Sequence, residues 1–241
     1  MDAMTGTLAN VAFILFGGVF FLITKRELSN ENQQIFRVII AGLVLYTGFK
    51  MLWAGLSGGL LRILGQLGIV FVSMSLGRIL GVILGIQKGF NRIAIFAKAQ
   101  LDQANQKRSQ MKSGFLLATG LFCVTPLAVI GSLVDGTTGN YHPLLIKGMM
   151  DALATMSFAR TFGLSVVLSC VPVLALQGSL TLLAQALVLK LPDPAWIQAL
   201  SATSGCLVFS VILIAFGIQN VRLGDYLPSL LIAPLLAQWW W

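Results

Sequence analysis

Charged side chains are scarce in this sequence. Of its 241 residues, 10% are Asp, Glu, Lys or Arg, whereas 57% are hydrophobic. Soluble globular domains carry about 25% charged residues and roughly 45–50% apolar ones, so this chain could not cover a water-exposed surface. Several almost uncharged runs approach or exceed the roughly 18 residues that mark a membrane-spanning helix. The composition excludes an ordinary soluble domain and predicts a helical protein that crosses a membrane several times.

Histidine and cysteine are also rare. The single histidine, His142, rules out a multi-histidine metal site within one subunit. Cys123, Cys170 and Cys206 are odd in number and lie inside apolar runs, which indicates small buried side chains and no disulfide framework. The nucleophile-elbow, zinc-protease, P-loop and dinucleotide motifs are absent from the sequence. We therefore expect no metal, no cofactor and no enzymatic activity.

Basic residues outnumber acidic ones, 16 against 8, but they gather between apolar runs. Residues 87–113 contain a single acid, Asp102, and these basic residues: Lys88, Arg92, Lys98, Lys107, Arg108 and Lys112. Such clusters follow from the excess of Lys and Arg in cytoplasmic loops, and no nucleic-acid-binding module accompanies them, so we expect no nucleic-acid partner. Lys25 and Arg26 directly follow the first apolar run. Together these charges predict a periplasmic N-terminus and a cytoplasmic segment 87–113.

This topology predicts which side of the membrane can reach residue 105. In a variant without the three native cysteines, Asn105→Cys should react with a membrane-impermeant maleimide only from the cytoplasmic side. Labelling is compared between cells with a permeabilised outer envelope and inverted membrane vesicles. Reaction from the periplasmic side alone would overturn the assignment.

The apolar runs predict an all-α, polytopic transmembrane bundle that forms one integral membrane domain, residues 1–241. About seven full spans are expected, at residues 6–24, 35–54, 60–86, 113–134, 144–162, 163–189 and 196–218. Pro126 should interrupt the fourth span, because proline removes a helix hydrogen bond. The sixth, roughly 40 Å long at 1.5 Å per residue, should tilt or break near Pro172 and Gly178. Residues 227–237 are too short for a straight span and predict a C-terminal half-helix or a re-entrant segment.

Residues 87–113 have a helical pattern of their own. Phe90, Ile93, Ala97 and Leu101 recur at spacings of three and four, which predicts an amphipathic helix on the inner membrane surface. The alternative interpretation is a solvated connector that packs on neighbouring segments.

A stripe of small residues runs along the third span. Gly77, Gly81 and Gly85 repeat every four residues, with Ser73 and Gly89 continuing the series. Small side chains let two helix backbones approach closely in lipid, so we expect a tight helix–helix contact here. The partner helix could belong to the same subunit or to a second copy in a homo-oligomer.

Glycines at corresponding places in the two halves of the chain indicate internal repeats as one interpretation. Gly17-Gly18 and Gly178-Ser179 occupy comparable places in the first and sixth spans, and Gly42 and Gly205 follow in the same order. Because five spans separate each pair, such repeats would be inverted in the membrane. The alternative is a chance resemblance between apolar helices.

The fifth span carries charges that a simple anchor would not contain. Lys147 and Asp151 lie one helical turn apart, and Thr155 continues the same face. A charge in mid-helix costs about 2.5–3.5 kcal/mol on insertion scales, so these residues predict a solute- or ion-binding site inside the protein, near an Asp135-Gly136 turn and Gln177. Structural pairing of Lys147 with Asp151 is the alternative. Arg160, on the opposite face, should be a separate interfacial anchor.

Four segments of the chain resemble a known family: GTLANVAFILFGG, FLLATGLFCVTPLAVIGSLVDGTTGN, LLIKGMMDALATMSFARTFGLSVVLSCVPVLALQGSLTLLA and LPSLLIAPLL. They are similar to the bacterial YqgA/YdfK-type inner-membrane proteins, a domain of unknown function, over nearly the whole chain. The resemblance implies a multi-pass protein of the bacterial inner membrane. It implies no substrate.

The broken spans, the possible repeats and the polar groups within spans lead to a functional hypothesis. We expect a transporter or permease for an unidentified small solute or ion, whose other partner is the lipid bilayer. The alternatives are a channel and a non-transporting structural or regulatory membrane protein.

Overall fold

The computed structural model describes residues 4–25, 29–104, 110–190, 194–215, 219 and 221–240. Every element within these ranges is a helix, which confirms the all-α prediction. Long apolar helices make up the bundle: α1 (Thr5–Thr24), α2 (Asn30–Ala54), α3 (Leu60–Leu84), α7 (His142–Phe162), α8 (Cys170–Lys190) and α9 (Pro194–Ala215). Among the described residues, five helical stretches are long and apolar enough to cross a membrane, and the count is six if a bent pair of helices forms one span. The predicted total of seven stays a prediction.

The bent pair consists of α5 (Gln110–Cys123) and α6 (Pro126–Thr138), whose axes differ by 56°. Thr125 between them is extended, with φ −107° and ψ 141°, because the ring of a following proline disfavours the helical conformation. Pro126 then starts α6 at the position where a missing N–H costs nothing. The predicted interruption of the fourth span is confirmed.

Of the two alternatives predicted for the sixth span, the break near Pro172 and Gly178 is wrong, and the tilt stays a prediction. Helix α8 runs unbroken through both residues, and the chain turns earlier, in the 3-10 helix η1 (Gly163–Ser169). Gly163 has φ 68° and ψ −158°, a conformation that glycine adopts without the clash of a Cβ. This turn reverses the chain direction between α7 and α8, and together they supply one of the five long apolar stretches.

The contacts of α1 establish this reversal. Gly6 lies against Leu144 and Gly17 against Ala152, so α1 and α7 run in the same direction. Thr7 faces Thr181 and Asn10 faces Gln177, so α8 runs the opposite way. Helix α1 is therefore the shared neighbour of two oppositely directed helices.

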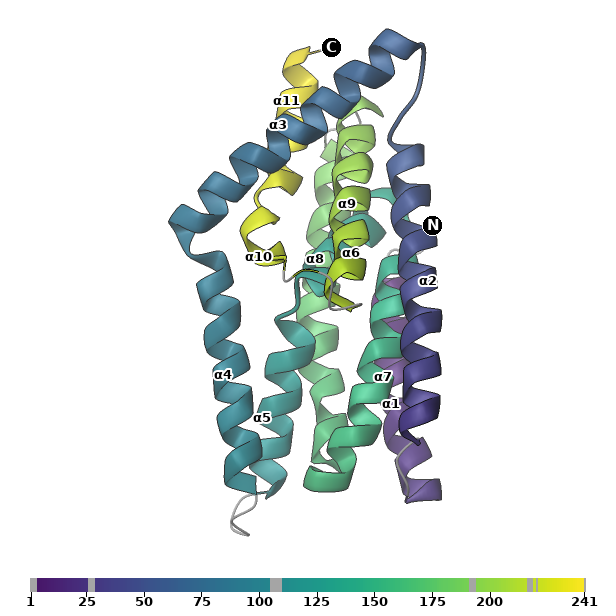
Figure 1. Cartoon of the computed structure of the whole chain (residues 1–241), viewed down its shortest axis with the longest axis vertical. Helices are drawn as coiled ribbons and strands as arrows, with labels where there is room; N and C mark the ends of the chain where they lie inside the picture. The colour runs from purple at the N-terminus through teal and green to yellow at the C-terminus, as the bar shows by residue number, and fades with distance from the viewer. Residues whose placement is uncertain are drawn as a thin grey trace.

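The amphipathic segment forms α4 (Ile86–Ala104). Figure 1 shows α4 and α5 side by side, as the two arms of a hairpin. The side chain of Ile93 in α4 packs closely against Gly120 of α5, where the absence of a Cβ allows the contact. The end of α1, the end of α4 and the start of α5 lie at the same, lower end of the molecule in Figure 1. Residues 105–109, and the side chains of Ala97 and Leu101, lie outside the described part. The placement of the hairpin relative to a membrane stays a prediction.

The glycine stripe of α3 packs against the C-terminal part of the same chain. Gly77 contacts Ser229 of α11 (Ser229–Trp240), and Gly81 contacts Asp225 of α10 (Leu223–Tyr226). The expected close contact is present, and its partner lies within the chain. Gly85 has another role: with φ 65° it ends α3. Helix α11, with Pro234 inside it, is the predicted short C-terminal helix.

The paired glycines of the two halves have different surroundings. Gly205 packs against Leu52 and Gly48 of α2, whereas nothing lies within 4 Å of a Cβ placed at Gly42. These two glycines are therefore not equivalent in packing. The inverted repeat stays a prediction.

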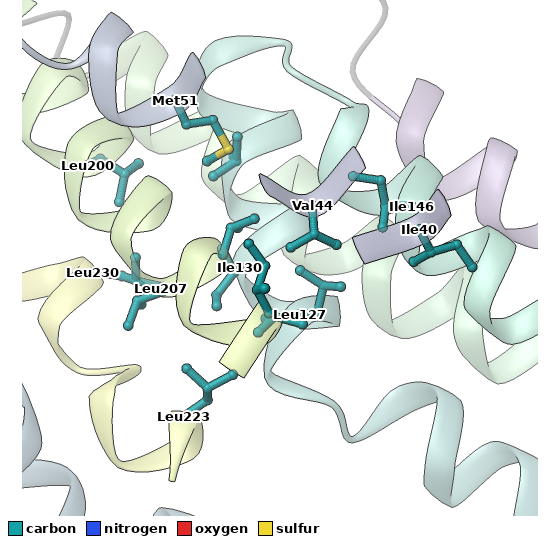
Figure 2. Packing of buried hydrophobic residues seen from close by; sticks show 14 residues of the cluster. Ile40, Val44, Met51, Leu127, Ile130, Ile146, Leu200, Leu207, Leu223 and Leu230 are labelled. Carbon is teal, nitrogen blue, oxygen red and sulfur yellow. The ribbon is translucent and has the colours of Figure 1, made fainter. Parts of the chain in front are cut away.

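Two apolar clusters flank α7. The larger joins α2, α6, α7, α9 and the C-terminal helices, and Figure 2 shows Ile146 of α7 in it beside Ile40 and Val44 of α2. The smaller joins α1, α5, η1 and α8 around Ile14, Phe122 and Val166. Because consecutive helical residues point about 100° apart, Lys147 turns away from the first cluster when Ile146 faces it.

Candidate functional site

The centre of the site is an ion pair on α7. The ammonium group of Lys147 binds the Oδ2 atom of Asp151, one turn further along the helix. Lys147 is only 2% exposed and Asp151 6%, so both charges are enclosed by protein. This confirms that the two side chains meet and that Asp151 does not face lipid. Neither charge could be buried without the other, because an unpaired ion in the interior is strongly destabilising.

Lys147 lies next to the break between α5 and α6. Its Nζ atom is 5.8 Å from the centre of the Phe122 ring, and Phe122 is in the last turn of α5. Aromatic faces attract cations at this distance. The last carbonyl groups of a helix also carry partial negative charge, so the end of α5 favours an ammonium group nearby.

Helices α1 and α8 supply amide groups beside the pair. Asn10 donates from Nδ2 to Oε1 of Gln177 at 3.1 Å, and both side chains are fully buried. The Asn10 side chain also lies next to the Asp151 carboxylate. Oδ1 of Asn10 and Nε2 of Gln177 have no hydrogen-bond partner in the protein. Because amide orientation is an assignment, exchanging N and O in both groups would still leave one donor and one acceptor free.

Thr155 uses its hydroxyl group within its own helix. Oγ1 donates to the backbone carbonyl of Asp151 at 2.7 Å, and the side chain is buried. Thr155 therefore lies on the same face of α7 as Lys147 and Asp151, as the sequence predicts. Its hydroxyl hydrogen is used in the bond to the backbone carbonyl.

Asp135 lies at a separate level of the bundle. The predicted turn at Asp135-Gly136 is wrong, since α6 continues to Thr138 and ends at Gly139, whose φ is 70°. The hydroxyl groups of Thr137 and Thr138 bond to carbonyls of the preceding turn within the helix. The Asp135 carboxylate accepts the N–H of Gly6 at 3.0 Å and so caps the start of α1.

The structure thus brings together Lys147, Asp151 and Gln177 and adds three residues that the predicted site omits. These are Thr7 and Asn10 of α1 and Thr181 of α8, all of them buried. Their spacing was a usable signal, because Thr7 and Asn10 lie three residues apart and Gln177 and Thr181 four, so each pair shares a helix face. Arg160 is exposed, in agreement with its predicted separation from the site.

Comparison with known proteins adds a family and no activity. The family model described as "Protein of unknown function (DUF554)" matches residues 5–238. The "Uncharacterized protein YqgA" of Escherichia coli K12 is 30% identical over 241 aligned positions, covering 97% of each chain. The "Uncharacterized membrane protein YdfK" of Bacillus subtilis 168 is 27% identical over 233 positions, 97% of this chain and 95% of the relative. No solved structure matches the chain. The resemblance predicted from the sequence is confirmed.

Proposed function

This chain belongs to the DUF554 family of proteins of unknown function, and we propose that it is a transporter for a small polar solute that binds between Lys147 and Asp151. The observation that carries the proposal is the buried ion pair with the amides of α1 and α8 around it. Ionisable residues inside membrane helices are costly and commonly mark solute or ion pathways. For stability alone, apolar side chains of similar volume would serve as well as a buried pair or better.

The charges of the site favour a zwitterionic solute. A cationic group can replace Lys147 at Asp151 while an anionic group binds Lys147, so the complex contains no unbalanced buried charge. The free amide donor and acceptor of Asn10 and Gln177 add two hydrogen-bonding groups beside the pair. Small amino acids and betaines have this arrangement of charges.

The break between α5 and α6 supports the same proposal. Transporters commonly bind solutes next to discontinuous helices, whose free backbone groups face the binding site. Here the 56° bend lies beside Lys147, on the side of Phe122. A bend of this kind also gives α6 a joint about which to move, and movement is required because the pair is enclosed.

Access of water-soluble reagents tests transport without knowledge of the solute. In a cysteine-free background, Thr155→Cys should react with a small, membrane-impermeant methanethiosulfonate, because a transport cycle exposes the site to water. Phe209→Cys, which lies on an exposed part of α9, is the control for reagent that reaches the bundle from lipid. A Thr155→Cys protein that stays unreactive from both sides would contradict a transport route through the site.

Solute exchange tests the roles of the two charges. Proteoliposomes loaded with unlabelled glycine, alanine or glycine betaine are assayed for counterflow of the radiolabelled compound. We expect Asp151→Asn to lower the rate at least about 100-fold, because the loss of one charge leaves both Lys147 and the solute unbalanced. Thr155→Val should keep most of the rate. A normal rate for Asp151→Asn would contradict the proposal.

A structural or regulatory membrane protein is the second candidate. The almost complete enclosure of Lys147 favours it, because the pair is satisfied without any solute. In that case Asp151→Asn would lower the stability of the protein, and Thr155→Cys would remain protected from reagent.

A further inference from the structure

The carboxylate of Asp135 has an uncompensated oxygen. Asp135 is 2% exposed, and its Oδ2 atom accepts the N–H of Gly6, whereas Oδ1 has no hydrogen-bond partner in the protein. Among the described residues, no lysine or arginine forms an ion pair with it. The N-terminus of α1, whose Met4, Gly6 and Thr7 N–H groups face the carboxylate, supplies about half a positive charge. A bound monovalent cation would balance the charge of this carboxylate.

Neutral oxygen atoms gather at the same level of the bundle. Thr7, which follows Gly6, faces Thr181 of α8, and Gly136, which follows Asp135, lies against the backbone carbonyl of Thr181. One turn along α1, Oδ1 of the fully buried Asn10 is also without a partner. Helices α1, α6 and α8 thus bring a carboxylate and two hydroxyls close together, with an amide oxygen one turn further along α1.

The spacing of the two hydroxyl oxygens suits a metal ion better than a hydrogen bond. Oγ1 of Thr7 and Oγ1 of Thr181 are 3.4 Å apart, longer than the usual O–H···O distance of about 2.7–2.8 Å. Two ligands that each lie about 2.4 Å from an ion, at right angles, are roughly 3.4 Å apart, and oxygen binds Ca²⁺ and the similarly sized Na⁺ at such distances. The larger K⁺ would separate them further.

The charge of the site selects a monovalent ion. Asp151 is occupied by Lys147, so among the residues that the structure describes Asp135 is the one carboxylate available at this level. In the described part of the chain, no group of three or more His, Cys, Asp or Glu side chains could hold a metal. A divalent ion here would remain a net buried charge, which is costly in a medium of low dielectric constant. Oxygen donors without sulfur or imidazole also suit a hard cation.

We propose that Asp135, Thr7, Thr181 and Asn10 form a sodium-binding site at the start of α1, one turn from the Lys147–Asp151 pair. Sodium bound there would tie α1 to α6 and α8. If the proposed function holds, this ion is the one coupled to solute movement, since Asn10 contacts Gln177 and Asp151 beside the ion pair and lies one turn of α1 from Thr7, between the two sites. Binding itself does not depend on that function.

Thermal stability measures the binding directly. The full-length protein in detergent is melted in NaCl, KCl or choline chloride at equal ionic strength. A ligand that binds only the folded state raises the Tm, and at sodium roughly thirty-fold above Kd we expect a rise of about 5 °C over choline. Equal Tm values in the three salts, or an equal rise in KCl, would overturn the proposal.

Two variants locate the site. Thr181→Val removes one oxygen at nearly constant volume and should raise the sodium concentration at half-maximal shift at least about ten-fold, while Asp135→Asn should abolish the shift. Thr203→Val is the matched control, because Thr203 is a fully buried threonine of α9 with an unpartnered hydroxyl group. A sodium shift unchanged in Thr181→Val would place the ion elsewhere and overturn the assignment.

The proposed function and the sodium site can fail independently. A sodium-dependent Tm together with absent solute exchange would speak against transport and leave the ion site intact. Solute exchange without any sodium-specific shift would speak against the ion site alone.

Discussion

Lys147→Met, made alone, is expected to lower the Tm of the protein by roughly 10 °C, the largest effect we predict for a single polar side chain. The substitution leaves the Asp151 carboxylate enclosed without its cation. Removing one partner of a buried ion pair costs about 3–5 kcal/mol, and a protein of this size loses roughly 2–4 °C per kcal/mol. The measurement is thermal melting of purified protein in detergent.

The double variant Lys147→Met, Asp151→Asn provides the critical comparison. It removes both charges, so most of the stability lost in Lys147→Met should return. Thr155→Val is the matched control on the same face of α7, and it should cost only about 1 kcal/mol because it removes one neutral hydrogen bond. Losses that simply add in the double variant would show that the pair is not the cause.

The same double variant separates stability from function. A double variant that regains its Tm but does not exchange solute would show that the charges are retained for binding. One that regains both would show that the ion pair is structural and that the solute binds elsewhere.

The ion pair of the site could be predicted from the sequence, whereas the amide pair beside it could not. Lys147 and Asp151 are four residues apart on one helix, so their contact follows from helix geometry alone. Asn10 and Gln177 lie 167 residues apart, and their pairing depends on α1 packing against α8. Apolar helices in lipid present many equivalent faces to one another, so the choice of neighbour could not be predicted from hydrophobic pattern.

The two prolines show why one break was predicted correctly and another was not. Pro126 follows the extended residue Thr125 and separates two helices, as expected of proline between apolar runs. Pro172 lies in the first turn of α8, where the N–H groups have no partner within the helix, so the helix continues. Gly163, whose positive φ ends α7, was the informative residue in that part of the chain.

The helix that packs against the glycine stripe could not be predicted from the sequence either. A stripe of small residues fits another helix of the same chain as well as a second copy. The residues that contact the stripe, Asp225 and Ser229, lie on either side of the short break between α10 and α11. This segment has no apolar periodicity from which the contact could have been predicted.

Gly81→Leu is expected to disrupt this joint. A Cβ placed at Gly81 would overlap the backbone carbonyl oxygen of Asp225, so any side chain must push α3 and α10 apart. The displacement also weakens the contact of Asp225 with the start of α4, where its Oδ1 atom accepts the N–H of Gln87 at 3.2 Å. Overpacking usually costs about 1–3 kcal/mol, and more when the backbone has to move. We expect a fall in Tm of roughly 10 °C.

Gly68→Leu is the matched control, because Gly68 lies on the same helix with nothing within 4 Å of an added Cβ. Leucine there should leave the Tm unchanged or raise it slightly, since leucine favours a helix by roughly 0.5–1 kcal/mol over glycine. The loss in Gly81→Leu should not depend on protein concentration, because both surfaces of the contact belong to one chain. A loss that grows on dilution, with a smaller particle in size-exclusion chromatography, would show that the stripe joins two copies.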